Sequence, residues 1–209
     1  MRYRAVIFDI GGVVVGSPLH AIADYERASG LPEGAINRVI VERGAAGAWS
    51  RLECGALTLE EFYPIFDAEC GAAGCPVSGR AMVAAMGAAA VPRPAMLAAI
   101  GRIRASGRRV AALTNNWRAG EPDLGALAPH FDLVVESAIE GIRKPDPRIY
   151  RLACERLDVG PEHAVFLDDI GANLKAARAL GMATIKVVEP DAALADLESL
   201  LALPLRDEP

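Results

Sequence analysis

Residues 4–12 read RAVIFDIGG, an apolar run that ends in Asp9 and is followed by the glycine pair Gly11 and Gly12. A short, uninterrupted run of this kind is typical of a buried strand in a parallel sheet, and the glycines predict a tight turn after it. Four other runs have a similar character, the last of them more weakly. They are VAALT at 110–114, AVFL at 164–167, ATIKVV at 183–188 and LVVE at 133–136.

Segments with helical periodicity separate these runs. Their apolar residues recur every three or four positions, which is the spacing of one helix face. The segments lie at 95–105, 147–157, 174–180 and 192–201. Strands that alternate with helices imply parallel pairing through right-handed crossovers. The sequence therefore predicts an α/β fold with a Rossmann-like parallel sheet flanked by helices.

Residues 16–90 break this alternation, because they contain no convincing buried strand. The segment predicts helices separated by turns rich in Gly and Pro, and Thr58 with Glu61 is a capping box that opens one of them. The expected helices lie at 19–29, 33–43, 58–68 and 78–89. We therefore expect an all-helical domain of residues 16–90, inserted into a core domain of residues 1–15 and 91–209.

Composition narrows the class of function. The chain has 209 residues, of which 52% are hydrophobic, and this length suits one α/β core with a modest insertion. Its net charge of −5 argues against nucleic acid or an anionic membrane as partner, and no segment approaches the ~18 apolar residues of a membrane span. The four cysteines show no metal-binding spacing and the N-terminus is too short an apolar run for a secretory signal, so we expect free thiols and a cytoplasmic protein.

Polar side chains with catalytic potential stand where the predicted strands end. They are Asp9 after the first strand, Thr114 and Asn115 at the end of VAALT, Asp168 and Asp169 after AVFL, and Lys144, one of only three lysines, before a helix. Each one alone is explained as a helix cap, a turn former or a solvated lysine. In a parallel sheet, however, ligands gather at the carboxyl ends of the strands, so the set as a whole predicts one site.

This set of side chains suits phosphoryl transfer. Mg²⁺ prefers hard oxygen ligands and keeps several waters, and neighbouring carboxylates repel one another unless a cation lies close by. A carboxylate can attack phosphorus and form an aspartyl-phosphate. An ammonium group with hydroxyl or amide donors then neutralises the transferring oxygens.

The motifs FDIGGVV, LTNN, KPDP and FLDDIGANLKAA, in this order, resemble the four motifs of the haloacid dehalogenase-like hydrolases. The resemblance extends from Val6 to about Leu201. More narrowly, LTNNW, ESAIEGIRKPDPRIY and FLDDIGANLKAARALGM resemble the phosphatase domain of soluble epoxide hydrolase and the hydrolase-like domain of the acyl-CoA dehydrogenase family member ten proteins.

The resemblance implies a Mg²⁺ cofactor, a small phosphorylated substrate and a role for each site residue. Asp9 is expected to be the nucleophile and a metal ligand. The other expected metal ligands are the Gly11 carbonyl and Asp169, with Asp168 as a further ligand or as support for one. Thr114 and Asn115 are expected to bind the phosphate, and Lys144 to bridge Asp9 and the phosphate. Residues 16–90 are expected to be a helical cap that closes over the site and sets substrate choice.

One departure affects the expected activity. Phosphatases of this family usually carry a second Asp two residues after the nucleophile, as general acid and base, and this chain has Gly11 there. Losing such a group typically costs on the order of 10²–10⁴ in rate. Three explanations of the glycine at position 11 stay open. The first is a phosphatase that is slow or whose substrate has a good leaving group, such as an acyl phosphate. The second is a catalytically silent phosphate-binding module, and the third is a haloacid dehalogenase. The Asp168–Asp169 pair weakens the dehalogenase reading, because those enzymes need no metal, and the lack of any lysine before Lys144 argues against a phosphonate hydrolase.

A few further residues have two possible readings. His20 is either a surrogate acid or a hinge residue. Trp117 either lines the pocket or packs under the cap, and Trp49 and Arg51 are candidates for substrate contact. Substrate identity and oligomeric state have no readable signal in this sequence.

Overall fold

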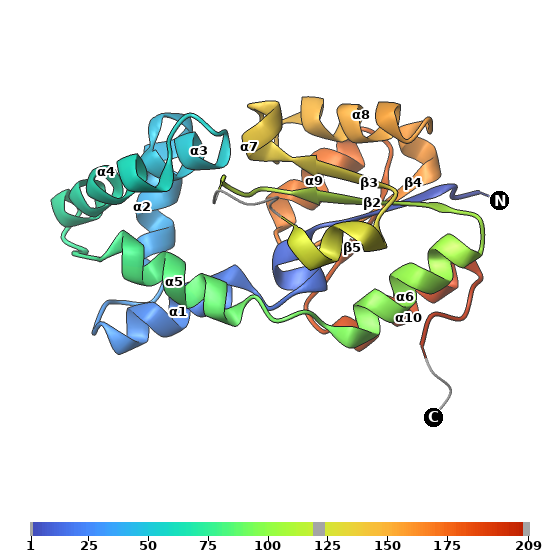
Figure 1. The fold of residues 1–209 in the computed structure, drawn as a ribbon, viewed down its shortest axis with the longest axis horizontal. Coiled ribbons are helices and arrows are strands. Elements are labelled where there is room, and N and C mark those ends of the chain that lie inside the picture. The colour runs from blue at the N-terminus through green and yellow to red at the C-terminus, as the bar shows by residue number, and fades with distance from the viewer. Residues whose placement is uncertain (1, 119–123, 207–209) are drawn as a thin grey trace.

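The computed structural model describes residues 2–118 and 124–206, in which five parallel strands form one sheet (Figure 1). The strands are β1 (Ala5–Phe8), β2 (Arg109–Thr114), β3 (Leu133–Glu136), β4 (Ala164–Asp168) and β5 (Ala183–Lys186). Their order is β3-β2-β1-β4-β5, so β1 lies at the centre, between β2 and β4. The chain therefore reverses its direction of travel across the sheet beside β1, which is where ligands bind in open α/β sheets.

Helices cover both faces of the sheet, which explains why its strands are apolar without alternation. One face packs against α6 (Pro94–Ala105) and α10 (Pro190–Leu201), and the other against α8 (Pro147–Arg156) and α9 (Gly171–Ala179). Because successive side chains of a strand point to opposite faces, Val6 and Phe8 enter the first of these cores and Ala5 and Ile7 the second.

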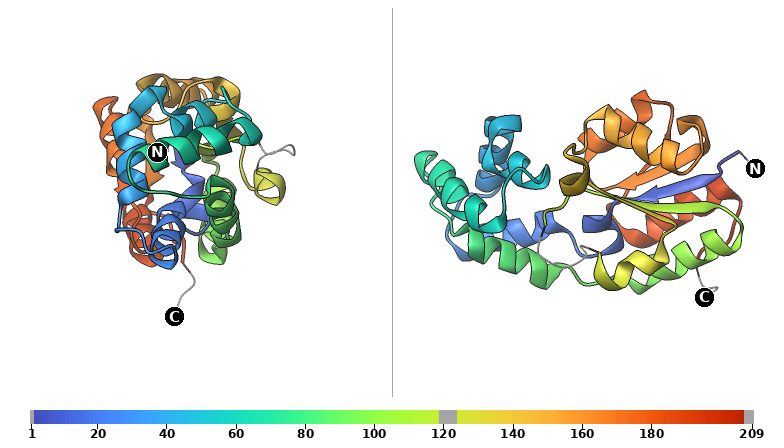
Figure 2. Two further views of the ribbon diagram at one scale, coloured as in Figure 1. Left: turned by 90° about the vertical axis from the view of Figure 1, so that its left-hand side faces the viewer. Right: turned by 45° about the horizontal axis from the view of Figure 1, so that its top comes forward.

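The chain leaves the core after Val15 and returns at Val91, and between these points, where every residue is described, it forms five α-helices. They are α1 (Pro18–Ala28), α2 (Ala35–Arg43), α3 (Ala48–Glu53), α4 (Leu59–Ala72) and α5 (Gly79–Ala89), called the inserted helices below. Figures 1 and 2 show them grouped at the end of the molecule towards which the strands run. They form a hydrophobic cluster of their own, in which Leu52, Phe62 and Phe66 are fully buried.

The outgoing and returning segments lie side by side where they join the core. Val15 and Pro92 form an antiparallel bridge. The Arg93 guanidinium donates hydrogen bonds to the carbonyl oxygens of Gly12, at 2.7 Å, and Val13, at 3.2 Å. The return segment is therefore tied directly to the loop that follows β1.

The predicted α/β fold, with a Rossmann-like parallel sheet flanked by helices, is confirmed. The capping box is also present, since the Thr58 hydroxyl accepts from the N–H of Glu61 and the Glu61 carboxylate accepts from the N–H of Thr58. Two short helices, α3 and α7 (Ser137–Glu140), were not expected. Residues 1, 119–123 and 207–209 of the expected core domain lie outside the described residues. In the described part of the chain, no helix has the length and apolar character needed to cross a membrane.

Candidate active site

Asp9 follows β1, the central strand, at the carboxyl edge of the sheet. Its side chain is buried, and its backbone N–H donates to the carbonyl of Leu167 at 2.9 Å. The N–H of Ile10 donates to Asp9 Oδ1 at 2.7 Å, and the Lys144 ammonium nitrogen lies 2.8 Å from the same oxygen. One carboxylate oxygen is thus held by two donors, which fixes the orientation of the Asp9 side chain.

The Lys144 ammonium group bridges two carboxylates at the centre of the site. Lys144 is only 1% exposed, and its Nζ lies 2.8 Å from Asp9 Oδ1 and 2.8 Å from Asp168 Oδ2. Burial alone lowers the pKa of Lys144, but the charges of Asp9 and Asp168 more than reverse this, so its pKa lies above the usual value. A buried ammonium is tolerated only when it is paired in this way, and Lys144 therefore stays positively charged.

Asp168, the last residue of β4, serves as an anchor for Lys144. It is fully buried, and its Oδ1 accepts from the N–H of Ile170 at 2.7 Å. The amide of Asn173 lies 3.1 Å from Oδ1 and 3.0 Å from Oδ2. Protein donors therefore engage both oxygens of Asp168, which favours a supporting role over direct metal ligation. Sequence reasoning missed Asn173, because an asparagine in the first turn of a helix usually forms only local backbone contacts.

The carboxylates of Asp9, Asp168 and Asp169 form a cluster that fits a divalent cation. Each offers one oxygen, and these oxygens lie within 4.8 Å of one another. Burial raises the pKa of Asp9 to about 8, although Lys144 acts to lower it, and burial and the charge of Asp168 raise the pKa of Asp169. The single positive charge of Lys144 does not balance three carboxylates. A hard cation such as Mg²⁺, bound by their oxygens, would neutralise the remaining negative charge.

Gly12 makes room for Asp169. It has a φ of 76°, in the left-handed region that favours glycine. A Cβ at this position would lie 2.1 Å from Asp169 Oδ2. Asp169 also accepts a hydrogen bond from the Ser17 hydroxyl at 3.2 Å. The loop after β1 is therefore shaped around this carboxylate.

At Gly11 the absence of a side chain has a different cause. Its φ of −65° and ψ of 130° are open to any residue, so the backbone does not demand glycine. A Cβ there would lie 2.7 Å from Cγ of Pro18 and 3.0 Å from its Cδ. Pro18, the first residue of α1, thus fills the space into which a side chain at position 11 would project.

Thr114 ends β2 and Asn115 follows it, and the two side chains have different partners. Thr114 is buried, and its hydroxyl lies 3.4 Å from the carbonyl of Asn115. The Asn115 side chain clasps the backbone of Lys144, since its amide donates to the Lys144 carbonyl at 3.1 Å and its Oδ1 accepts from the Lys144 N–H at 2.9 Å. Asn115 therefore holds the lysine segment against β2, and the Thr114 hydroxyl stands at the sheet edge as the candidate phosphate donor.

The other residues singled out by the sequence lie around the inserted helices. Trp49 of α3 and Trp117 meet edge to face, with ring centroids 6.0 Å apart, so Trp117 packs under the inserted helices. Arg51 on α3 and His20 on α1 are exposed.

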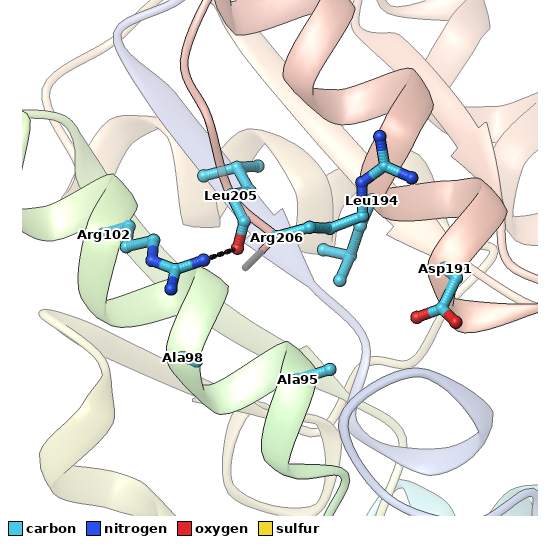
Figure 3. Close-up of a pocket in the computed structure, with 7 residues that line it drawn as sticks. All are labelled: Ala95, Ala98, Arg102, Asp191, Leu194, Leu205 and Arg206. Atoms are coloured by element: carbon cyan, nitrogen blue, oxygen red, sulfur yellow. Dashed lines mark hydrogen bonds between the residues drawn. The ribbon is translucent and has the colours of Figure 1, made fainter. Parts of the chain in front are cut away.

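A separate hollow of about 290 Å³ lies between α6 and α10 (Figure 3). Both arginines that line it have protein partners: Arg102 points to the carbonyl of Leu205 and donates to it, and Arg206 pairs with Glu198. Neither Asp9 nor Lys144 lines this hollow. This hollow is therefore not the candidate active site, despite its volume.

Comparisons with known proteins agree with the family resemblance found in the sequence motifs. The family model described as haloacid dehalogenase-like hydrolase matches residues 3–181. Acyl-CoA dehydrogenase family member 10 of Mus musculus is 43% identical over 208 residues, which cover 97% of this chain and 20% of that protein. Bifunctional epoxide hydrolase 2 of Sus scrofa is 33% identical over 226 residues, which cover 100% of this chain and 40% of that protein. The chain thus spans less than half the length of these relatives.

A solved structure shares the fold. It is a haloacid dehalogenase family enzyme of Bacteroides thetaiotaomicron in complex with magnesium and inorganic phosphate. The TM-score is 0.64 at 20% sequence identity, and the match covers 90% of this chain and 96% of that chain.

Proposed function

Since the chain belongs to the haloacid dehalogenase-like hydrolases, we propose that it is a Mg²⁺-dependent phosphohydrolase acting on a small phosphorylated metabolite. The observation that carries this proposal is the Lys144 ammonium, 2.8 Å from both Asp9 and Asp168 and buried at the carboxyl edge of the central strand. A fixed carboxylate beside a fixed cation is the arrangement that phosphoryl transfer to an aspartate needs.

In the first half of the proposed reaction, a carboxylate oxygen of Asp9 attacks phosphorus. The new O–P bond forms while the bond to the leaving oxygen breaks, which gives an aspartyl-phosphate. Water then attacks phosphorus, the bond to Asp9 breaks, and inorganic phosphate leaves. Lys144 and the Thr114 hydroxyl stabilise the charge on the transferring oxygens.

Asp9, Asp169 and the carbonyl of Gly11 are the groups that we propose to hold the metal. When bound there, Mg²⁺ would supply positive charge next to the phosphoryl oxygens. Asp168 would keep Lys144 in place, since its own oxygens are already engaged.

Position 11 bears on the preferred substrate. The leaving oxygen cannot take a proton from Gly11, and the space for a side chain there is filled by Pro18. A weakly basic leaving group, such as the carboxylate of an acyl phosphate, departs without a proton, whereas an alkoxide needs one. We therefore propose that acyl phosphates are hydrolysed faster than alkyl phosphate monoesters.

We also propose separate roles for the inserted helices and the core. Residues 16–90 would act as a cap over the core of residues 1–15 and 91–209 and would select the leaving group. The net charge of −5 and the four free thiols favour a cytoplasmic protein that acts on a free metabolite, and not on nucleic acid or a membrane surface.

The test is phosphate release from a panel of acetyl phosphate, p-nitrophenyl phosphate, sugar phosphates and a lysophospholipid phosphate. Each is measured with Mg²⁺, with EDTA, and with Asp9→Asn. Release that needs Mg²⁺ and disappears in Asp9→Asn supports the proposal. Equal background in wild type and Asp9→Asn rejects it.

A second candidate function is a phosphate-binding module without turnover. The position of Pro18 favours it, because Pro18 fills the space that a side chain at position 11 would need. Such a module would bind inorganic phosphate in a calorimeter and release none from any panel member, even at stoichiometric protein.

A further inference from the structure

One short helix, α3, lies against two core segments next to the candidate phosphate-binding residues: the segment that follows Thr114 and Asn115, and the segment that precedes Lys144. Figure 1 shows α3 beside α7, and the two helices are in contact. Gly55, just after α3, comes so close to the core that a Cβ there would lie 2.2 Å from the carbonyl oxygen of Ala138. The inserted helices therefore contact the core through α3 and its C-terminal turn, in addition to the contact of α1 with the loop after β1.

Three side chains on one face of α3 make these contacts. Trp49 meets Trp117, which follows Thr114 and Asn115 in the loop after β2. Ser50 and Glu53 both reach Arg143, which directly precedes Lys144. The helix thus touches Trp117, which follows Thr114 in the chain, and Arg143, which precedes Lys144.

Arg143 is held by a hydrogen bond and a charge contact. Its Nη1 donates to the Ser50 hydroxyl at 2.7 Å. Its Nε lies 2.8 Å from Glu53 Oε2, but the N–H does not point at that oxygen, so this contact is mainly electrostatic. Glu53 is 6% exposed, and burial raises its pKa while the nearby Arg143 acts to lower it. A carboxylate buried in this way depends on the guanidinium beside it.

The path from Arg143 to the reacting groups is short. The next residue, Lys144, has its N–H and its carbonyl clasped by the Asn115 side chain, and its ammonium reaches Asp9. A shift of the Arg143 backbone would therefore reach the peptide group that Asn115 holds, and with it the Cα from which the Lys144 side chain extends.

We propose that Arg143 is a positioning residue, through which Ser50 and Glu53 of α3 fix the segment that presents Lys144 to Asp9. The docking of α3 on the core would then also place Lys144 beside Asp9. The inference rests on the proposed function for its effect on turnover, but the placement of Lys144 is measurable without any turnover.

The experiment uses the scarcity of lysine in the chain. Lys144, Lys175 and Lys186 are the three lysines, so protein labelled with ¹³C at lysine Cε gives three side-chain signals, and Lys144→Arg identifies the one that belongs to Lys144. The test variants are Arg143→Met and Ser50→Ala, the second of which changes no charge. The control is Arg156→Gln, which breaks an arginine–glutamate pair with Glu140 on the core, with an N–O distance of 2.6 Å.

We expect the Lys144 signal to move in both test variants, while the Lys175 and Lys186 signals stay in place and the control changes nothing. On the best panel substrate, kcat should fall by on the order of 10²-fold in Arg143→Met and by less in Ser50→Ala, because a misplacement of about 1 Å can cost that much. Arg143→Lys should recover part of the loss, since it keeps the charge but not the forked geometry.

An unmoved Lys144 signal in a folded Arg143→Met or Ser50→Ala protein overturns the proposal, whatever happens to kcat. A moved signal with unchanged kcat in an active enzyme also overturns it. If Arg143→Met does not fold, Ser50→Ala decides the question. If wild type shows no turnover at all, the proposed function fails, and the signal still decides whether α3 positions Lys144.

Discussion

The Gly11→Asp substitution, made alone and together with Pro18→Ala, tests how the site works without the usual acid and base. The backbone at Gly11, with φ −65° and ψ 130°, accepts an aspartate. The obstacle is Pro18, because the new Cβ would lie 2.7 Å from its Cγ and 3.0 Å from its Cδ. Pro18→Ala removes both of these atoms and leaves a good helix former at the start of α1.

The structure predicts different results for the single and the double variant. Gly11→Asp alone overpacks the turn, which costs about 1–3 kcal/mol and lowers Tm by about 2–12 °C, and its carboxyl group is displaced from the working position. Pro18→Ala alone costs about 0.4–1 kcal/mol through the freer unfolded chain. In the double variant, a placed acid should raise kcat for an alkyl phosphate by on the order of 10²–10⁴, or about 2.7–5.4 kcal/mol of barrier.

The assay compares kcat for an alkyl phosphate and for acetyl phosphate, with thermal unfolding of each variant alongside. The gain should be confined to the alkyl phosphate, because the acetyl phosphate leaving group needs no proton. Equal gains on both substrates would refute the assignment of position 11 as the missing acid. A Gly11→Asp protein that matches the double variant in both Tm and kcat would refute the role given to Pro18.

Three further perturbations probe the metal and the lysine anchor. Burial raises the pKa of Asp9 to about 8, so a proton competes with Mg²⁺ for this carboxylate below that pH. Calorimetry should find that the affinity for Mg²⁺ rises by up to about tenfold per pH unit from about pH 6 and levels off above about pH 8. An affinity that does not change with pH would contradict the metal role of Asp9. Gly12→Ala places a Cβ 2.1 Å from Asp169 Oδ2 at a φ of 76°, so it should destabilise the protein and abolish Mg²⁺ binding; binding at wild-type affinity would show that Asp169 is no ligand. Asn173→Leu removes donors from both oxygens of Asp168, so we expect a loss of about 1–3 kcal/mol in urea unfolding together with a lower kcat, and an unchanged kcat would remove Asp168 from the account.

The strands were predictable because the sheet is covered on both faces, which forces each strand to be an uninterrupted apolar run. The same logic placed Asp9, Thr114 and Asp168 at one edge, since parallel strands end together. The order of the strands was not predicted. Alternation of strands and helices does not specify it, yet it is the central position of β1 that sets Asp9 between Thr114 and Asp168.

The remaining features of the site depend on contacts between distant parts of the chain. The sequence showed that Gly11 lacks a carboxyl group, but only the fold shows that Pro18 occupies the space. Phosphate binding by Asn115 stays a prediction, and what the fold adds is that the Asn115 side chain holds the Lys144 backbone. Helix α3 was missed because six residues are too few to show a helical period.

The central claim is that Asp9 accepts the phosphoryl group, and trapping the intermediate tests it most directly. Wild-type protein with Mg²⁺ is mixed with acetyl phosphate, quenched in acid during the first turnover and digested for mass spectrometry. We expect the peptide containing Asp9 to gain the mass of one phosphoryl group, and EDTA and Asp9→Asn each to abolish this gain. Phosphate release by the wild type with no adduct on that peptide, or an adduct that persists in Asp9→Asn, would contradict it.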